Sequence, residues 1–162
     1  MNKISVYILF FALLLTFVAC NKEDASLQNR QWLINKTREF KNLYAVGYEQ
    51  VTQFQNIDNP CRKGANPQTA ALFHAVLQNL NKSFTAYKND CSARLGKEAE
   101  NDALIREHLQ DVEEICQPFA DNENLAKCGQ VEEKVAREFF QLKNPIELES
   151  AAIALERRIE MK

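Results

Sequence analysis

The chain has 162 residues, of which 46% are hydrophobic and 26% charged, with 20 basic side chains against 22 acidic ones. This length suits one domain with a core of its own and is too short for two ordinary domains. A net charge of −2 gives no reason to expect the concentrated basic surface that phosphate binding needs, so nucleic acid is excluded as an expected partner.

An apolar segment opens the chain. Lys3 is the only charged residue before Lys22, and residues 4–18 carry almost no polar groups. Because spanning a bilayer takes roughly 20 apolar residues, this shorter run with charges directly after it is typical of a signal peptide rather than of a retained anchor. We therefore interpret residues 1–20 as a cleaved signal and expect residues 21–162 to form a single helical domain.

The end of the signal allows two kinds of processing. Cleavage after Cys20 by an ordinary signal peptidase would use Val18 and Cys20 as the small residues that it inspects. The segment Phe17-Val18-Ala19-Cys20 also resembles the lipobox of bacterial lipoproteins, although Phe17 stands where leucine is usual. That resemblance implies acylation of Cys20, and membrane contact is expected only in this case.

Two further features favour the secreted form. Either cleavage leaves an even set of four cysteines for disulfides, and the sequons at Asn35 and Asn81 suit N-glycosylation in a secretory pathway. We therefore expect an extracellular protein, with a lipid anchor in a bacterial cell envelope as the alternative.

Five amphipathic segments follow, each with apolar residues at alternating steps of three and four. The first is predicted from about Ser26 to Ile57, because Asp58-Asn59-Pro60 disfavours helix. The second is expected to begin at Asn66-Pro67, an N-cap followed by proline at the first helical position, and to end at Gly96.

The remaining three segments lie in the second half of the chain. The third covers residues 105–116 and is expected to end before Pro118, and the fourth covers residues 125–142 after the capping candidate Asp121. The fifth begins at Asn144-Pro145-Ile146-Glu147, which resembles a capping box.

These segments predict an all-α fold. Four glycines in the whole chain and the absence of Asn-Gly and Asp-Gly pairs leave little room for a sheet. Short connections between long amphipathic helices favour antiparallel neighbours, so we expect an up-and-down bundle of four or five helices.

The four remaining cysteines, Cys61, Cys91, Cys116 and Cys128, permit three pairings. Joining Cys61 to Cys91 would connect opposite ends of a helix about 35 Å long, whereas a disulfide needs Cα atoms within roughly 7 Å. Cys91 and Cys116 are separated by a third helix of about 25 Å. By elimination we expect two disulfides, Cys61–Cys116 and Cys91–Cys128, that staple the bundle.

The sequence shows no motif for catalysis, a cofactor or a metal. Ala71 and Ile105, three residues before His74 and His108, stand where a di-iron bundle would have glutamates, and paired Cys-x-x-Cys spacing is absent. His108 falls on an apolar stripe and is interpreted as a hydrogen-bonded core histidine. The acidic pairs Glu113-Glu114 and Glu132-Glu133 are interpreted as solvated, so no catalytic residue is assigned and no enzyme is expected.

We therefore expect a secreted, non-enzymatic protein that binds another protein through exposed helix faces, by analogy at the level of fold alone. One alternative is the lipoprotein anchored through Cys20. The other is a carrier of a small apolar ligand held between aromatic side chains, although their helical spacing predicts core positions first. These aromatic residues are Trp32, Phe40, Tyr44, Phe73, Phe84, Phe139 and Phe140.

Overall fold

The computed structural model describes residues 3–55 and 59–161, and the side chains of residues 25–54, 59–138 and 140–161. Within these ranges no strand occurs, and extended pairing is limited to an isolated bridge between Arg62 and Val131. The predicted all-α class is confirmed. The helices are α1 (Lys3–Gln55), α2 (Pro67–Leu95), α3 (Glu98–Asn101), α4 (Ala103–Ala120), α5 (Asn122–Ala126), α6 (Glu133–Phe139) and α7 (Pro145–Glu160).

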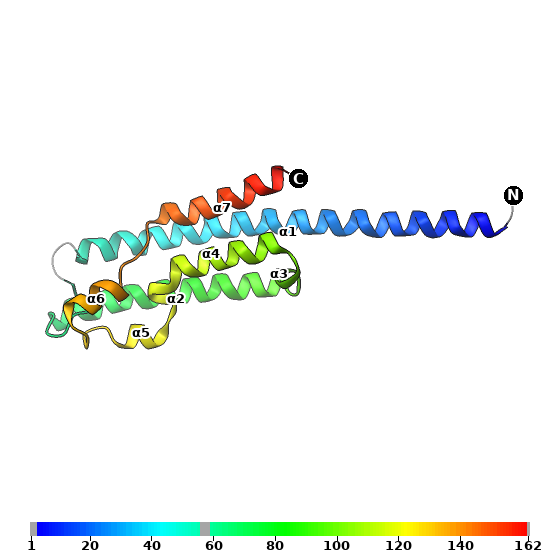
Figure 1. The fold of residues 1–162 in the computed structure, drawn as a ribbon. Helices are drawn as coiled ribbons and strands as arrows, with labels where there is room; N and C mark the ends of the chain where they lie inside the picture. The colour runs from blue at the N-terminus through cyan, green and yellow to red at the C-terminus, as the bar shows by residue number, and fades with distance from the viewer. Residues whose placement is uncertain (1–2, 56–58, 162) are drawn as a thin grey trace.

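Four long helices enclose the core. Helix α1 packs on α2 and α7, and α4 completes the ring by packing on the same two helices. Along the chain the four helices alternate in direction, so that each packs antiparallel to the next, as short connections favour. The N-terminal part of α1 projects well beyond the bundle (Figure 1).

Helix α1 begins earlier than the sequence pattern predicts. It runs without a break from Lys3 through the expected cleavage point, and beyond that point the Ser26 hydroxyl donates to Asp102. The predicted end at Ile57 lies outside the described residues. The core side of α1 carries Leu33, Ile34, Thr37, Phe40, Tyr44 and Val51.

Helix α2 has the predicted ends. The Asn66 side chain accepts hydrogen bonds from the backbone N–H groups of Gln68 and Thr69, which satisfies two of the free donors at a helix N-terminus. Gly96 ends the helix with φ +49°, a value that favours glycine.

The predicted end of the third segment before Pro118 is wrong. Helix α4 continues through Pro118 to Ala120. Proline removes one backbone donor from the last turn, and the free carbonyl oxygens there are satisfied from another helix. The Asn81 side-chain amide of α2 donates to the carbonyls of Phe119 at 2.7 Å and Ala120 at 3.1 Å.

The predicted fourth helix over residues 125–142 is also wrong, because it divides into α5 and α6. Asp121 caps α5 as expected, accepting from the N–H of Glu123 at 2.7 Å. The chain then turns at Gly129, where φ is +84°, and the Gly129 N–H donates to the carbonyl of Cys61 at 2.7 Å. The left-handed Gly129, with its distant hydrogen-bond partner, therefore lies in the connection between α5 and α6 despite the apolar periodicity on both sides of it.

Helices α1 and α2 approach each other closely at Gly47, where an added Cβ would lie 2.5 Å from Leu80 Cδ2. We expect Gly47→Leu to lower the free energy of unfolding by more than about 2 kcal/mol, because the added side chain overpacks a filled interface. Urea unfolding measures the change, and Val46→Leu is the control because Val46 is 61% exposed. Equal stability of the two variants would contradict the close approach.

Candidate functional site

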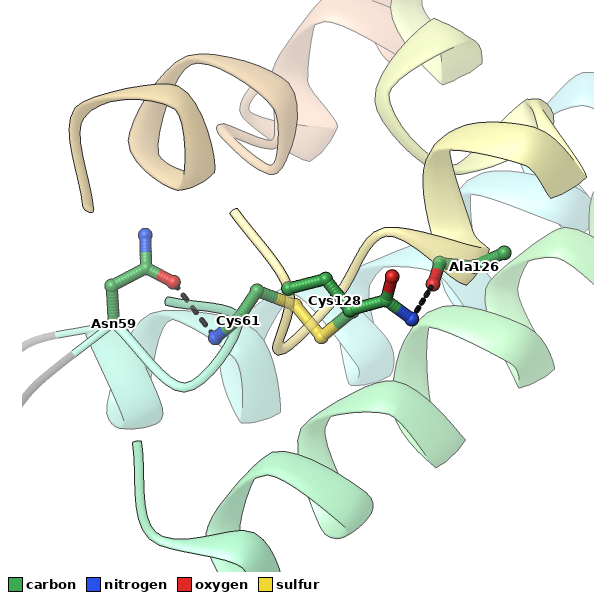
Figure 2. Close-up of a disulfide and its surroundings, with 5 residues drawn as sticks. Asn59, Cys61, Ala126 and Cys128 are labelled. Carbon is green, nitrogen blue, oxygen red and sulfur yellow. Dashed lines mark hydrogen bonds between the residues drawn. A yellow bond between two sulfur atoms is a disulfide. The ribbon is translucent and has the colours of Figure 1, made fainter. Parts of the chain in front are cut away.

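A disulfide between Cys61 and Cys128 joins two connections at one end of the bundle (Figure 2). The two Cα atoms lie 4.3 Å apart, although 67 positions separate the residues in the sequence. The side-chain oxygen of Asn59, itself buried, accepts from the Cys61 N–H at 3.0 Å. The disulfide therefore fixes the α1–α2 connection to the α5–α6 connection.

The predicted pairs Cys61–Cys116 and Cys91–Cys128 are wrong. Cys91 and Cys116 are free and buried. The sequence argument assumed that all four cysteines are paired. Rejecting a Cys91–Cys116 bond therefore also rejected Cys61–Cys128, which belongs to the same pairing. The break between α5 and α6 allows Cys128 to reach Cys61, because Cys128 lies in a connection rather than on a continuous helix facing Cys91.

Burial suppresses the ionisation of both free thiols. It raises the pKa of Cys91 to about 11, against a smaller lowering by a hydrogen bond with Tyr87, and it raises the pKa of Cys116 well above its ordinary value. Because the thiolate is the nucleophilic form of cysteine, neither residue has the chemistry of a reactive cysteine at neutral pH.

A chain of hydrogen bonds crosses the core and involves all four bundle helices. Thr37 Oγ1 on α1 lies 3.0 Å from Tyr87 Oη on α2 and 2.8 Å from His108 Nε2 on α4. His108 Nδ1 lies 3.2 Å from the carbonyl oxygen of Ala151 on α7. The prediction that His108 is a hydrogen-bonded core residue is confirmed.

The direction of these bonds follows from the Ala151 carbonyl, which can only accept. Nδ1 of His108 therefore carries the hydrogen. Burial lowers the pKa of His108 to about 4, so the ring is neutral at pH 7 and Nε2 accepts from the Thr37 hydroxyl. The Thr37 oxygen in turn accepts from Tyr87. The sequence interpretation did not predict that Thr37 and Tyr87 belong to this chain of hydrogen bonds. Their position as hydroxyl-bearing residues on apolar stripes was the signal that could have indicated it.

The structure places the two sequons in different surroundings. Asn35 is exposed on α1. At Asn81, the amide nitrogen that would carry a glycan donates to the two carbonyls at the end of α4. Glycosylation stays a prediction, and the folded state is compatible with it at Asn35. The side chain of Cys20 lies outside the described residues.

The acidic pairs and His74 lie at or near the surface. The carboxylates Glu113, Glu114, Glu132 and Glu133 are all exposed, as the sequence predicts. His74 is half-buried on α2 beside a small cleft of about 380 Å³. No group of three or more potential metal ligands comes together in the described parts of the chain.

The aromatic side chains fill the core by packing against one another. Phe40 and Tyr87 stack with ring centres 5.1 Å apart, and Tyr44 lies 5.6 Å from Phe119. A cleft of about 750 Å³ is instead an open surface feature at the end of the bundle from which α1 projects. Its polar groups already contact each other, since Asp102 binds Arg30 at 2.6 Å and Ser26 at 3.1 Å.

The chain matches no protein-family profile, no curated protein and no solved structure. No helix in the part that the structure describes is long and apolar enough to cross a membrane.

Proposed function

We propose that this chain is an exported, non-enzymatic binding protein that is secreted and contacts another protein through an exposed helix face. The disulfide between Cys61 and Cys128 is the observation that carries the proposal. Disulfides persist in oxidising compartments and are rare in the cytosol, so the bond agrees with an N-terminal signal peptide. Cleavage after Cys20 leaves this pair and two buried thiols.

The non-enzymatic part of the proposal is supported by how the candidate chemical groups are used. Both ring nitrogens of His108 are engaged inside the core. Cys61 and Cys128 form the disulfide, and burial raises the pKa of Cys91 and Cys116. A nucleophile needs an activating base and access to substrate, and these groups have neither.

The exposed face shared by α1 and α2 is the surface that we propose for partner binding. Leu43 and Val46 on α1 are 60% and 61% exposed, and Leu72 on α2 is 56% exposed. Leu43 lies with Ser83 along a cleft of about 320 Å³ between these helices. Leu72 is eleven residues before Ser83, about three helical turns, and therefore lies on the same side of α2.

Site-specific photo-crosslinking in the cells that produce the protein tests this surface. A crosslinker at Leu43 is expected to capture one defined protein, and the same group at Ile146 is the control, because Ile146 is 69% exposed on α7. Changing Val46 to Asp should abolish the Leu43 crosslink. Equal capture from both positions, or capture that Val46→Asp leaves unchanged, would contradict the proposal.

A lipid-anchored form is the second candidate, and the course of α1 favours it. The helix is continuous from Cys20 to Ser26, which contacts the bundle through Asp102. Six residues of helix span about 9 Å, so an acylated Cys20 would hold the end of the bundle that carries α3 close to the membrane. A diacylglyceryl group on Cys20 of the native protein selects this form, and an N-terminus at Asn21 rejects it.

A further inference from the structure

Helix α7 is docked by a short apolar face together with polar contacts. Its buried residues are Leu148, Ala151, Ala152 and Leu155, two of which are alanines, and the partly buried Ile159 packs against the core. Helix α2 buries larger side chains, which are Phe73, Leu77, Leu80, Phe84, Tyr87, Cys91 and Leu95. Because hydrophobic stabilisation scales with the apolar area removed from water, the two alanines add little to it, and polar contacts contribute to the docking of α7.

Two carboxylates of α7 attach it to α1. Arg38 donates to Glu149 at 3.0 Å through Nε and to Glu156 at 2.8 Å through Nη2. Lys41 binds the second oxygen of Glu149 at 2.8 Å. These side chains are only about one-third exposed or less, with Glu156 at 36%, and a network of this kind contributes more than isolated surface pairs.

Two further contacts attach α7 to α4. Arg158 lies 2.5 Å from Glu107, and the Ala151 carbonyl accepts from His108 at 3.2 Å. At the beginning of the helix, the Tyr44 hydroxyl donates to the carbonyl of Lys143 at 2.6 Å. Of the contacts of α7 described above, the one from Tyr44 involves neither a carboxylate nor a histidine.

A fall in pH weakens both the carboxylate contacts and the histidine contact of α7. Hydrogen bonds from Lys41 and Arg38 hold the pKa of Glu149 below its usual range, so its ion pairs are lost only when acid protonates it. A proton on His108 would place a charge among the neutral groups that face it, which are Thr37, Tyr87 and the Ala151 carbonyl, with Cys91 beyond Tyr87.

One nearby carboxyl group acts in the opposite direction. Burial, together with Glu114 and Glu107, raises the pKa of Asp111, while Arg158 lowers it. Protonation of Asp111 therefore relieves repulsion as the pH falls. It opposes two groups, Glu149, whose ion pairs to Arg38 and Lys41 are lost on protonation, and His108, whose ring would become charged inside the core.

The contacts among α1, α2 and α4 differ, because aromatic packing dominates them. Phe84 on α2 packs against Phe40 of α1 at 5.8 Å and against Phe119 of α4 at 6.2 Å. These ring contacts do not titrate, although the His108–Thr37 hydrogen bond and the Arg30–Asp102 ion pair, which link α1 to α4 and to its N-cap, do depend on pH. The Cys61–Cys128 disulfide also stays closed in acid and holds the α1–α2 connection.

We propose that α7 is an acid-released helix. When the pH falls, α7 leaves α1 and α4 while the other three helices stay packed, and the surface that it covered becomes accessible. Tyr44 keeps the connection before α7 in place during this change. The inference goes beyond the proposed binding function and does not depend on it.

Hydrogen–deuterium exchange of the purified protein at pH 7 and pH 4 tests the proposal, with rates corrected for the intrinsic effect of pH. At pH 4 the backbone amides of residues 145–160 are expected to lose roughly 100-fold or more of their protection and to exchange well before those of α2 and α4, whose exchange still requires the bundle to unfold. Equal protection of all four helices at pH 4, or unchanged protection of α7, would overturn it.

A pair of variants separates the role of the carboxylates from a general effect of acid. Glu149→Gln combined with Glu156→Gln should reduce α7 protection at pH 7 about tenfold or more, since both ion pairs to Arg38 are removed. Glu113→Gln is the matched control, because it removes the exposed Lys88–Glu113 pair between α2 and α4. Equal α7 protection in the double variant and in this control would overturn the proposal.

Discussion

Changing Cys61 and Cys128 together to alanine is expected to lower the free energy of unfolding by about 4 kcal/mol, less if the denatured chain keeps residual structure. The reason is the loop that the bond closes, since 67 positions separate the two residues and the broken bond releases that loop in the unfolded state. The far-ultraviolet helical signal should persist below the transition, because neither cysteine lies within a helix. Urea unfolding followed by circular dichroism measures the change.

The free thiols provide the control for this experiment. A reductant should lower the unfolding midpoint of the parent protein and of a variant with Cys91→Ala and Cys116→Ala, because both keep the Cys61–Cys128 bond. It should leave the variant without Cys61 and Cys128 unchanged. If the variant lacking Cys91 and Cys116 becomes insensitive to reductant, the pairing described above is wrong.

The second large expected effect is the dependence of the free energy of unfolding on pH, which His108 causes. Burial lowers its pKa in the folded state to about 4, whereas an unperturbed histidine has a value of 6.5. Between these values the unfolded chain binds a proton that the folded chain does not, so stability is full above pH 6.5 and falls as the pH falls to 4. The total loss is about 3 kcal/mol.

Urea unfolding at several pH values checks this prediction in the parent protein and in His108→Gln, whose side chain does not titrate. The variant is expected to be less stable at pH 7 and to lose less stability toward pH 4. His74→Gln, which removes the only other histidine of the chain, should follow the parent curve. Parallel curves for the parent and His108→Gln would show that His108 is not held neutral in the core.

Local signals were sufficient for part of the fold. Asn66-Pro67 and Gly96 predicted both ends of α2, and Asn144-Pro145 predicted the beginning of α7, because capping groups act on backbone atoms within a few residues. The exposed acidic pairs and the core position of His108 followed from helical periodicity in the same way.

The errors concern interactions between distant segments. Apolar periodicity continued across Gly129, and nothing local shows that its N–H reaches the carbonyl of Cys61. Pro118 remained helical, and Asn81, a residue of α2, satisfies the carbonyls of Phe119 and Ala120 at the end of α4. The Thr37–Tyr87–His108 chain depends on the register of three helices, which periodicity alone does not supply.

Intact-mass measurement and non-reducing peptide mapping of the native protein test the central claim, export with a single internal disulfide, most directly. The account predicts a mature chain that begins at Asn21, a peptide linking Cys61 to Cys128, and thiols at Cys91 and Cys116 that react only after unfolding. A diacylglyceryl group on Cys20 would replace the secreted form by the anchored one. A chain that keeps residues 1–20 and carries four free thiols at positions 61, 91, 116 and 128 would contradict export altogether.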